Sequence, residues 1–307
     1  MKYILITPAR NEEAFIEKAL ASMVAQKVLP ERWVIVDDGS TDSTAELAEN
    51  YARRFSWIEV IHRPQRLDHS FAGKVHAFNA GLERVRALEF EVIGNLDADL
   101  SFEPDYLAFL MRKFSEDQKL GVAGTPFTED GGYDTAKDSF EGENYVAGGC
   151  QLFRYRCFQE IGGYVPNRAG GVDWIAVMTA RMKGWKVQSF PEKRFHHHRT
   201  LGTAEKNILG AIFAYGERAY YLGGSPIWNF FRGMYRMTQK PFLLGGLALI
   251  SGYCWAAVRR TKRPVSREMI RFHRRDQMRK LKTILGALLR LKKVDSFRLV
   301  TAREQTR

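Results

Sequence analysis

Residues 91–99 read EVIGNLDAD, an apolar segment that ends in two aspartates one residue apart. The apolar run predicts a buried β-strand over 91–96, with the aspartates just past its end. Earlier segments at 2–7, 32–36 and 57–62 also read as strands, and amphipathic segments at 12–26, 44–55 and 74–87 read as helices. Strands that alternate with helices in this way predict an α/β fold built on a doubly wound, mostly parallel sheet.

Two pairs of aspartates lie directly after predicted strands. Asp37 and Asp38 follow the strand at 32–36, and Asp97 and Asp99 follow the strand at 91–96. Ligands bind at the carboxyl ends of the strands in such sheets, so both pairs lie where a nucleotide is expected. Asp97 and Asp99 suit Mg²⁺ or Mn²⁺, because these hard cations prefer oxygen ligands and stabilise charge on a departing diphosphate. The alternative for Asp97 and Asp99 is a solvated turn, and the alternative for Asp37 and Asp38 is an Asx turn that caps the next helix.

Several segments together resemble one known family. TPARNEE at 7–13, VDDGSTD at 36–42, GKVHAFNAGL at 73–82 and NLDAD at 95–99 are followed by IGGY at 161–164 and VDW at 172–174, with Arg181 and Gly184 beyond. In this order and spacing, about residues 3–200 resemble the inverting family-2 glycosyltransferases. The resemblance implies a GT-A (Rossmann-like) fold, a UDP-, GDP- or dTDP-sugar donor, and Mg²⁺ or Mn²⁺ as cofactor.

The resemblance gives roles to the residues that match its motifs. Those expected at the nucleotide-sugar are Thr7, Pro8, Arg10, Glu12, Asp37, Asp38, Lys74, Asn79 and Asp97. Asp97 and Asp99 match the metal motif, and Asp173 matches the carboxylate that acts as general base. The family commonly has Glu before this aspartate, whereas this chain has Val172. The alternative role for Asp173 is a cap of the helix predicted at about 174–183.

Three consecutive histidines stand at 196–198. Similarity to some GT-A enzymes implies that one of them, with His197 as the candidate, completes the coordination of a metal at Asp99. Alternate residues of a strand point to opposite faces, so at most one or two of the three can share an ion. A polar loop that binds no metal is the alternative.

The expected activity is inverting transfer of a single sugar to a lipid-linked or nascent cell-surface glycan acceptor. The Gln-x-x-Arg-Trp pattern of processive synthases is absent from the sequence, which favours transfer of one residue over polymer extrusion. Transfer to polyprenyl phosphate is one alternative, and a non-catalytic sugar-nucleotide-binding scaffold at the membrane is another. The scaffold would be expected to lack Asp97, Asp99 or Asp173, and all three are present. A nucleotidyltransferase would normally carry a glycine-rich loop near its start, whereas residues 7–13 contain no glycine.

Charge divides the chain near residue 200, where we place the domain boundary. Residues 1–200 carry 25 Lys and Arg against 29 Asp and Glu, whereas residues 201–307 carry 22 against 6. The basic region also contains 17 uncharged residues at 242–258, FLLGGLALISGYCWAAV, followed by Arg259 and Arg260. We expect this helical region to associate with an anionic membrane surface. The protein would then lie at the cytoplasmic face of the cell membrane, in a peripheral or monotopic arrangement.

Two alternatives to this membrane interpretation remain for 242–258. A single crossing would place the basic tail outside, against the positive-inside rule, and a buried core helix needs no membrane.

Nucleic-acid binding is not expected, because no nucleic-acid-binding motif accompanies the arginines. The three cysteines are expected to be small buried side chains without disulfides, and residues 1–6 are expected to form the first strand and not a signal peptide.

Overall fold

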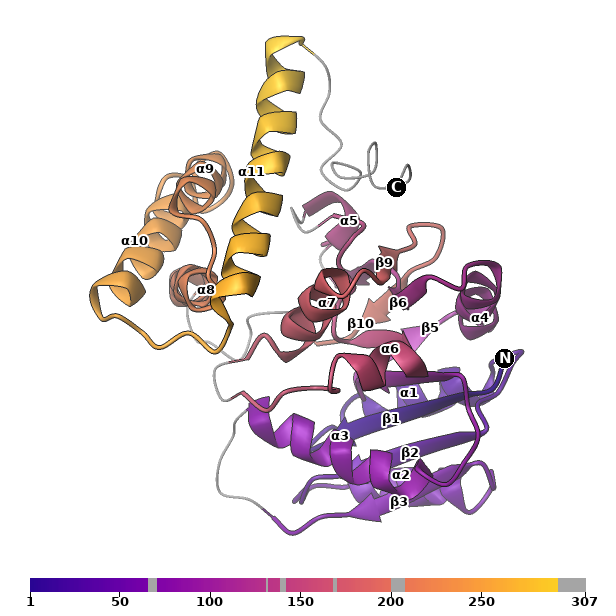
Figure 1. The fold of residues 1–307 in the computed structure, drawn as a ribbon. Helices are drawn as coiled ribbons and strands as arrows, with labels where there is room; N and C mark the ends of the chain where they lie inside the picture. The colour runs from indigo at the N-terminus through magenta and orange to yellow at the C-terminus, as the bar shows by residue number, and fades with distance from the viewer. Residues whose placement is uncertain (66–70, 131, 139–141, 168–169, 200–207, 292–307) are drawn as a thin grey trace. The chain divides into compact units, whose positions relative to one another are not determined.

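The computed structural model describes residues 1–65, 71–130, 132–138, 142–167, 170–199 and 208–291. The chain forms two compact units, Met1–Arg199 and Thr200–Arg307. The first unit is α/β, and the described residues of the second unit form only helices and their connections (Figure 1). Residues 201–207 and 292–307 of the basic region lie outside the described residues.

A seven-stranded sheet forms the centre of the first unit (Figure 1). Its strand order is β3-β2-β1-β4-β8-β6-β9, with bounds β1 Tyr3–Ala9, β2 Arg32–Asp37, β3 Ile58–His62, β4 Val92–Leu96, β6 Leu120–Gly124, β8 Cys150–Arg154 and β9 Lys186–Ser189. β1 to β4 pair in parallel, and β6 and β9 also pair in parallel, whereas β8 runs antiparallel to both β4 and β6. The predicted α/β fold with a mostly parallel sheet is confirmed.

Helices cover both faces of this sheet, because successive residues of a strand point to opposite sides. Leu5 of β1 packs in one buried cluster with α1, α2 and α4, whereas Ile4 and Ile6 pack in a second cluster with α3, α6 and α7. The helices of this unit are α1 Ile16–Val24, α2 Thr44–Ala52, α3 Phe71–Val85, α4 Tyr106–Glu116, α5 Thr135–Asp138, α6 Tyr155–Glu160 and α7 Val172–Met182. Two apolar layers therefore hold the strands in place and fix the polar residues at their ends.

A three-stranded sheet extends the end of β4. Its order is β5-β10-β7, with bounds β5 Leu100–Phe102, β7 Phe127–Glu129 and β10 Phe195–His197. β10 pairs antiparallel with β5, which aligns His197 with Leu100, and parallel with β7, which aligns His197 with Glu129. Because β5 begins directly after Asp99, this small sheet brings the distant histidines next to the predicted metal motif.

The first helix begins later than the sequence predicts, whereas the second begins at the predicted residue, Thr44. The helix predicted from residue 12 starts at Ile16, because residues 12–15 form a turn in which the Glu12 carbonyl oxygen accepts from the Phe15 and Ile16 N–H groups. At the start of α2, Asp42 accepts from the Thr44 N–H at 3.0 Å and from its hydroxyl at 2.6 Å. These local hydrogen bonds satisfy backbone donors at the helix start that would otherwise lack a partner.

The second unit contains α8 Ile208–Tyr221, α9 Pro226–Arg236, α10 Leu244–Val258 and α11 Arg267–Leu289. Helices α8, α9 and α10 make close backbone contacts through glycines. A Cβ at Gly252 of α10 would lie 2.0 Å from the carbonyl oxygen of Phe213 in α8, and one at Gly246 would lie 2.3 Å from that of Gly233 in α9. No larger side chain fits these positions without moving a helix backbone.

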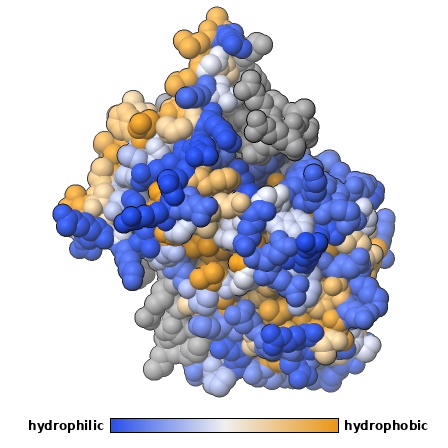
Figure 2. All heavy atoms as spheres, in the orientation of Figure 1, coloured by the Kyte–Doolittle hydropathy of each residue, from blue (hydrophilic) through white to orange (hydrophobic). Residues whose placement is uncertain are grey.

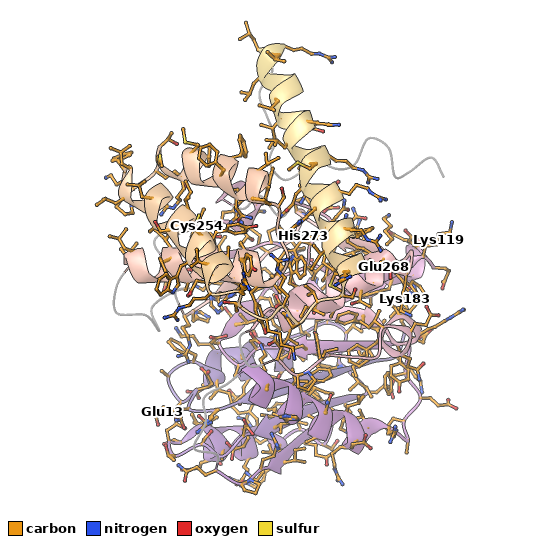
Figure 3. All side chains as sticks on the ribbon, turned by 60° about the vertical axis from the view of Figure 1, so that its left-hand side comes forward. Glu13, Lys119, Lys183, Cys254, Glu268 and His273 are labelled. Atoms are coloured by element: carbon orange, nitrogen blue, oxygen red, sulfur yellow. The ribbon has the colours of Figure 1, made fainter. Side chains whose placement is uncertain are left out.

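The apolar segment 242–258 forms α10 and the turn before it. Within the described part of the chain, no helix is both long enough and apolar enough to cross a membrane. Cys150 and Cys157 are buried, as predicted, but the prediction for Cys254 is wrong, because this residue is exposed on α10 (Figure 3). The helix buries its glycine face against α8 and α9 and leaves Cys254 on another side.

Candidate active site

The predicted carboxylates gather at one edge of the large sheet. Asp37 and Asp38 lie at the end of β2 and Asp97 follows β4, with β1 between these two parallel strands. Asp37 accepts from the Ser40 N–H at 3.0 Å, and Asp38 accepts from the Arg63 guanidinium at 2.7 Å. Asp37 thus binds an N–H three residues further on, within the loop before α2, and does not cap that helix. The carboxyl ends of parallel strands are also where ligands bind in such sheets.

Asp97 is held by a lysine and an asparagine. Lys74 Nζ donates to Asp97 Oδ1 at 2.5 Å, and Asn95 Nδ2 donates to the same oxygen at 2.9 Å. Burial raises the pKa of Asp97, although the charge of Lys74 opposes this rise. Burial alone would lower the pKa of Lys74, but the charge of Asp97 and their hydrogen bond raise it. The site therefore holds an ammonium group beside a partly buried carboxylate.

Asp99 contacts two cationic side chains from the end of this unit. His197 Nε2 lies 3.4 Å from Asp99 Oδ2, and Arg199 Nε donates to the same oxygen at 3.3 Å. Burial alone would raise the pKa of Asp99, but the hydrogen bond and charge of His197, with the charges of Lys74 and Arg199, hold it below its ordinary value. The other oxygen, Oδ1, is buried and has no hydrogen-bond partner among the described residues.

Glu12 adds a third carboxylate to this cluster. Arg199 Nη2 donates to Glu12 Oε2, so one guanidinium joins Glu12 to Asp99. Burial, followed by the negative charges of Asp99 and Asp97, raises the pKa of Glu12 to about 7, although Arg199 opposes the rise. The three carboxylates therefore lie close enough to repel one another, and an added cation would relieve that repulsion.

The oxygen donors at this site fit a hard divalent cation. Asp99 Oδ1 is a buried carboxylate oxygen that lacks a partner, and Mg²⁺ and Mn²⁺ prefer oxygen ligands of this kind. Among the described residues, no group of three or more His, Cys, Asp or Glu side chains is arranged to hold an ion. An ion at Asp97 and Asp99 would therefore need further ligands from phosphate oxygens or water, which is usual for Mg²⁺.

The role of His197 as a metal ligand stays a prediction. Its Nε2 faces Asp99, and its Nδ1 lies 3.1 Å from Glu129 Oε1. Burial would lower the pKa of His197, but the hydrogen bonds and charges of these two carboxylates raise it. Because a ligating histidine must be neutral, the two carboxylates that stabilise the charged form of His197 oppose its binding to a metal. The rings of His196 and His198 contact Asp130 and Ser101, so only the middle histidine directs its ring at the Asp99 carboxylate.

Asp173 lies in the first turn of α7, next to an aromatic hydroxyl and a glycine. The Tyr145 hydroxyl donates to Asp173 Oδ2 at 2.7 Å. A Cβ at Gly148 would lie 2.9 Å from Asp173 Cβ and 3.0 Å from Oδ2, so the glycine leaves the space that the carboxylate occupies. The helix begins at Val172 with Gly171 as its N-cap residue, so the alternative role of Asp173 as the cap is not observed.

Asn95 and Lys74 connect the two ends of the site. Asn95 Nδ2 donates to Asp97 and also, at 2.7 Å, to the carbonyl oxygen of Gly148, which lies against Asp173. The charge of Asp173, like that of Asp97, raises the pKa of Lys74. Asp97 and Asp173 therefore lie around a common space, although 76 positions separate them in the sequence.

Four of the predicted nucleotide-binding residues have different surroundings. Thr7 is buried, and its hydroxyl accepts from the Trp33 indole N–H at 2.8 Å, so it supports the sheet. Pro8 and Arg10 are partly buried at the end of β1. Asn79 is exposed on α3, five residues beyond Lys74 and therefore on a different side of the helix. Their nucleotide contacts stay predictions.

Sequence reasoning missed three residues that shape this site. Tyr145 and Gly148 lie in an irregular stretch before β8, where no periodic pattern marks them. Arg199 directly follows the three histidines, and its position beside a predicted metal ligand was the available signal.

Comparison with known proteins now defines the class. The model of glycosyl transferase family 2 matches residues 4–172, and the chain belongs to this family. It is 31% identical over 127 residues to the "Uncharacterized glycosyltransferase EpsJ" of Bacillus subtilis (strain 168), which is 40% of this chain and 33% of that protein. It is 32% identical over 117 residues to the poly-beta-1,6-N-acetyl-D-glucosamine synthase of Staphylococcus aureus (strain COL), which is 38% of this chain and 26% of the synthase. The match thus spans a third or less of these relatives.

Solved structures share the fold over most of the chain. The mannosyltransferase PcManGT from Pyrobaculum calidifontis, in complex with GDP-Man and Mn²⁺, has a TM-score of 0.56 at 16% identity and covers 95% of this chain and 81% of its own. Residues 1–349 of Staphylococcus aureus TarS, in complex with UDP-GlcNAc, have a TM-score of 0.55 at 15% identity. This match covers 97% of this chain and 89% of the TarS chain. At these identities the likeness establishes the fold alone, and the family-2 GT-A prediction is confirmed.

Proposed function

We propose that this glycosyltransferase moves a single sugar, with inversion, from a nucleotide-diphosphate sugar to a lipid-linked or nascent cell-surface glycan acceptor. Asp97 and Asp99 bind Mg²⁺ or Mn²⁺ in this proposal, and Asp173 is the general base. PcManGT and TarS were each solved with a sugar nucleotide, which supports a donor of this class. The observation that carries the proposal is the arrangement of Asp97 and Asp173 around Lys74.

The side chains have complementary tasks in this reaction. Lys74 places a positive charge beside Asp97, where it can stabilise phosphate oxygens of the donor. A divalent metal held by Asp97 and Asp99 would supply Lewis-acid stabilisation of the leaving diphosphate. Tyr145 donates to Asp173 Oδ2, which orients the carboxylate and leaves Oδ1 to accept the proton of an acceptor hydroxyl. Proton removal and stabilisation of the leaving group are thus assigned to different carboxylates.

Thermal unfolding with a panel of UDP-, GDP- and dTDP-sugars tests the donor site. A ligand present at 100 times its dissociation constant stabilises the folded state by about 2.7 kcal/mol. We expect one class of donor to raise the melting temperature in the presence of Mn²⁺ but much less in EDTA. Asp99→Ala should abolish this rise, whereas Glu83→Ala, which removes an exposed carboxylate of α3, should keep it. If no sugar nucleotide stabilises the wild type, the proposal is wrong.

The base assignment needs a separate measurement. Asp173→Asn should retain Mn²⁺-dependent donor stabilisation, because it does not alter Asp97 or Asp99, and should lose transfer activity. Proton NMR of the first product formed would show whether the anomeric configuration is inverted. Retention of configuration would contradict a mechanism with one base and no covalent intermediate.

We also propose that the helical unit holds the protein at the cytoplasmic face of the cell membrane. Ile227, Phe230 and Met234 follow one face of α9 at spacings of three and four residues, and each is at least half exposed. Four more residues before and within the first turn of α10 are also more than half exposed: Phe242, Leu243, Leu244 and Leu247. Figure 2 shows hydrophobic atoms gathered over α9 and α10.

This combination of exposed apolar side chains and excess positive charge is typical of helices that lie in the membrane interface. Extraction of membranes from the producing cells tests the arrangement. We expect 1 M salt to release little of the protein and mild detergent to release most of it. Complete release by salt would leave only an electrostatic attachment and would overturn insertion of the α9 face.

A further inference from the structure

Three arginines surround one hollow in the helical unit. The hollow has a volume of about 470 Å³ and is lined by Arg263, Arg267, Ile270 and Arg271. Within the part of the chain that the structure describes, none of the three arginines forms a salt bridge with an acidic side chain. Glu268, the acidic residue nearest in sequence, lies on the same helix (Figure 3) and also makes no salt bridge among the described residues. The positive charge of this arginine hollow is therefore not neutralised within the described unit.

Two of the four residues that line the arginine hollow, Arg263 and Ile270, are fixed by packing, whereas Arg267 and Arg271 are exposed. Arg263 Nε donates to the carbonyl oxygen of Tyr220 at 3.0 Å, and its guanidinium lies over the Tyr220 ring at 4.1 Å. Ile270 packs so closely against the turn after α8 that a Cβ at Gly223 would lie 2.5 Å from Ile270 Cγ1. The end of α8 and the start of α11 are thus held together. Because Nε makes the contact with Tyr220, the terminal nitrogens of Arg263 remain for a ligand.

The start of α11 adds to the positive potential of the arginine hollow. Arg267 is the first residue of the helix, and Arg271 lies one turn later on the same side. Like charges at this spacing repel each other, so local helix stability does not account for them. The first turn of a helix also carries unpaired N–H groups and the positive end of the helix dipole, both of which favour an anion.

We propose that the arginine hollow binds a phosphate group. Guanidinium groups form paired hydrogen bonds with phosphate oxygens, and three of them match a multiply charged tetrahedral anion better than a singly charged carboxylate. The phosphate could belong to a membrane lipid head group or to a soluble phosphate or diphosphate. No residue that lines the arginine hollow belongs to the carboxylate cluster of the first unit, so the proposal does not depend on glycosyl transfer.

Two double variants of the full chain separate a defined site from general positive charge. Arg267→Gln with Arg271→Gln removes two charges from the arginine hollow. Arg275→Gln with Lys282→Gln removes two charges from exposed positions of the same helix that do not line the hollow. Neither double variant removes a salt bridge or hydrogen bond among the described residues, and loss of the repulsion between Arg267 and Arg271 should leave α11 at least as stable. Far-ultraviolet circular dichroism and a melting curve would verify folding.

The first arm measures flotation with vesicles of phosphatidylcholine containing 30% phosphatidylglycerol at 0.15 M salt. If the phosphate comes from lipid, the hollow variant should partition about 30-fold less than the wild type, the loss expected for two arginines that contact an anionic surface. The control variant should lose clearly less than the hollow variant, because its two charges do not line the hollow. The second arm measures thermal stabilisation by inorganic pyrophosphate without lipid. If the phosphate is soluble, only the hollow variant should lose this stabilisation.

Selective loss by the hollow variant in either arm supports the site and identifies the source of the phosphate. Equal behaviour of the two double variants in both arms would overturn the proposal. That result would leave the positive charge of α11 as a diffuse surface property. Because neither arm measures sugar transfer, failure of this proposal is distinguishable from failure of the proposed enzymatic function.

Discussion

Replacement of Gly148 by alanine tests the position of the proposed base. The new methyl carbon would lie 2.9 Å from Asp173 Cβ and 3.0 Å from both Cγ and Oδ2. Non-bonded carbon atoms are most stable at about 3.5–4.0 Å, so the carboxylate would have to move by about 0.5–1 Å. A displacement of about 1 Å from a reactive geometry can lower a rate by about 100-fold, which corresponds to about 2.7 kcal/mol of transition-state stabilisation.

The assay is release of nucleoside diphosphate from the donor that stabilises the wild type. We expect Gly148→Ala to lower kcat by about 10- to 100-fold and to retain Mn²⁺-dependent donor stabilisation, because the methyl group is directed at Asp173. Gly149→Ala is the matched control, since its methyl group would meet the edge of the Phe195 ring at 3.3 Å and not the carboxylate. A wild-type rate for Gly148→Ala would refute the assignment of Asp173. Equal losses in both alanine variants would mean that the loop as a whole had been distorted.

Three further outcomes are expected. Tyr145→Phe should lower kcat by about 10- to 100-fold, since a hydrogen bond to a charged group contributes about 1.5–3 kcal/mol, and should retain Mn²⁺-dependent donor stabilisation; an unchanged kcat would mean that this hydroxyl does not position Asp173 for the reaction. Asp42→Ala should lower the free energy of unfolding by about 1 kcal/mol at pH 7. Burial opposes the shift, but hydrogen bonds hold the pKa of Asp42 below its ordinary 3.8, so this stabilisation is fully present at pH 7 and is lost as the pH falls through the folded pKa; urea unfolding should show a smaller difference at pH 3 than at pH 7. Ellman's reagent should modify Cys254 alone in the native protein and all 3 thiols after unfolding. The other two thiols should not react in the native protein, because burial raises the pKa of each to about 12. Rapid labelling of a second thiol in the native protein would contradict the burial.

The fold of the first unit could be predicted to a large extent from its sequence. Buried parallel strands read as apolar runs, and their ends are marked by the aspartates at 37–38 and 97–99, so both the sheet and its ligand-binding edge follow from local patterns. The antiparallel β8 and the three-stranded sheet were not predicted. Their pairing depends on contacts between segments far apart in the chain, such as His197 with Glu129 and Leu100.

The site was predicted less completely than the fold. The motifs identified the carboxylates of the site. Several motif residues nevertheless make contacts within the protein, such as Thr7 with Trp33 and Asp38 with Arg63. Gly148 matters because it lacks a Cβ next to Asp173, and no sequence pattern can show which side chain a glycine faces. Such features depend on how loops meet after folding.

The glycine contacts between α8, α9 and α10 determine how the helical unit responds to a change of solvent. Contacts between helix backbones depend on close fit and dispersion attraction, and less on the removal of apolar side chains from water. An interface of this kind retains its stability when the outer faces of its helices exchange water for acyl chains. The α8–α10 bundle is therefore suited to amphitropic behaviour, in which the same internal packing persists in aqueous solution and at a lipid interface.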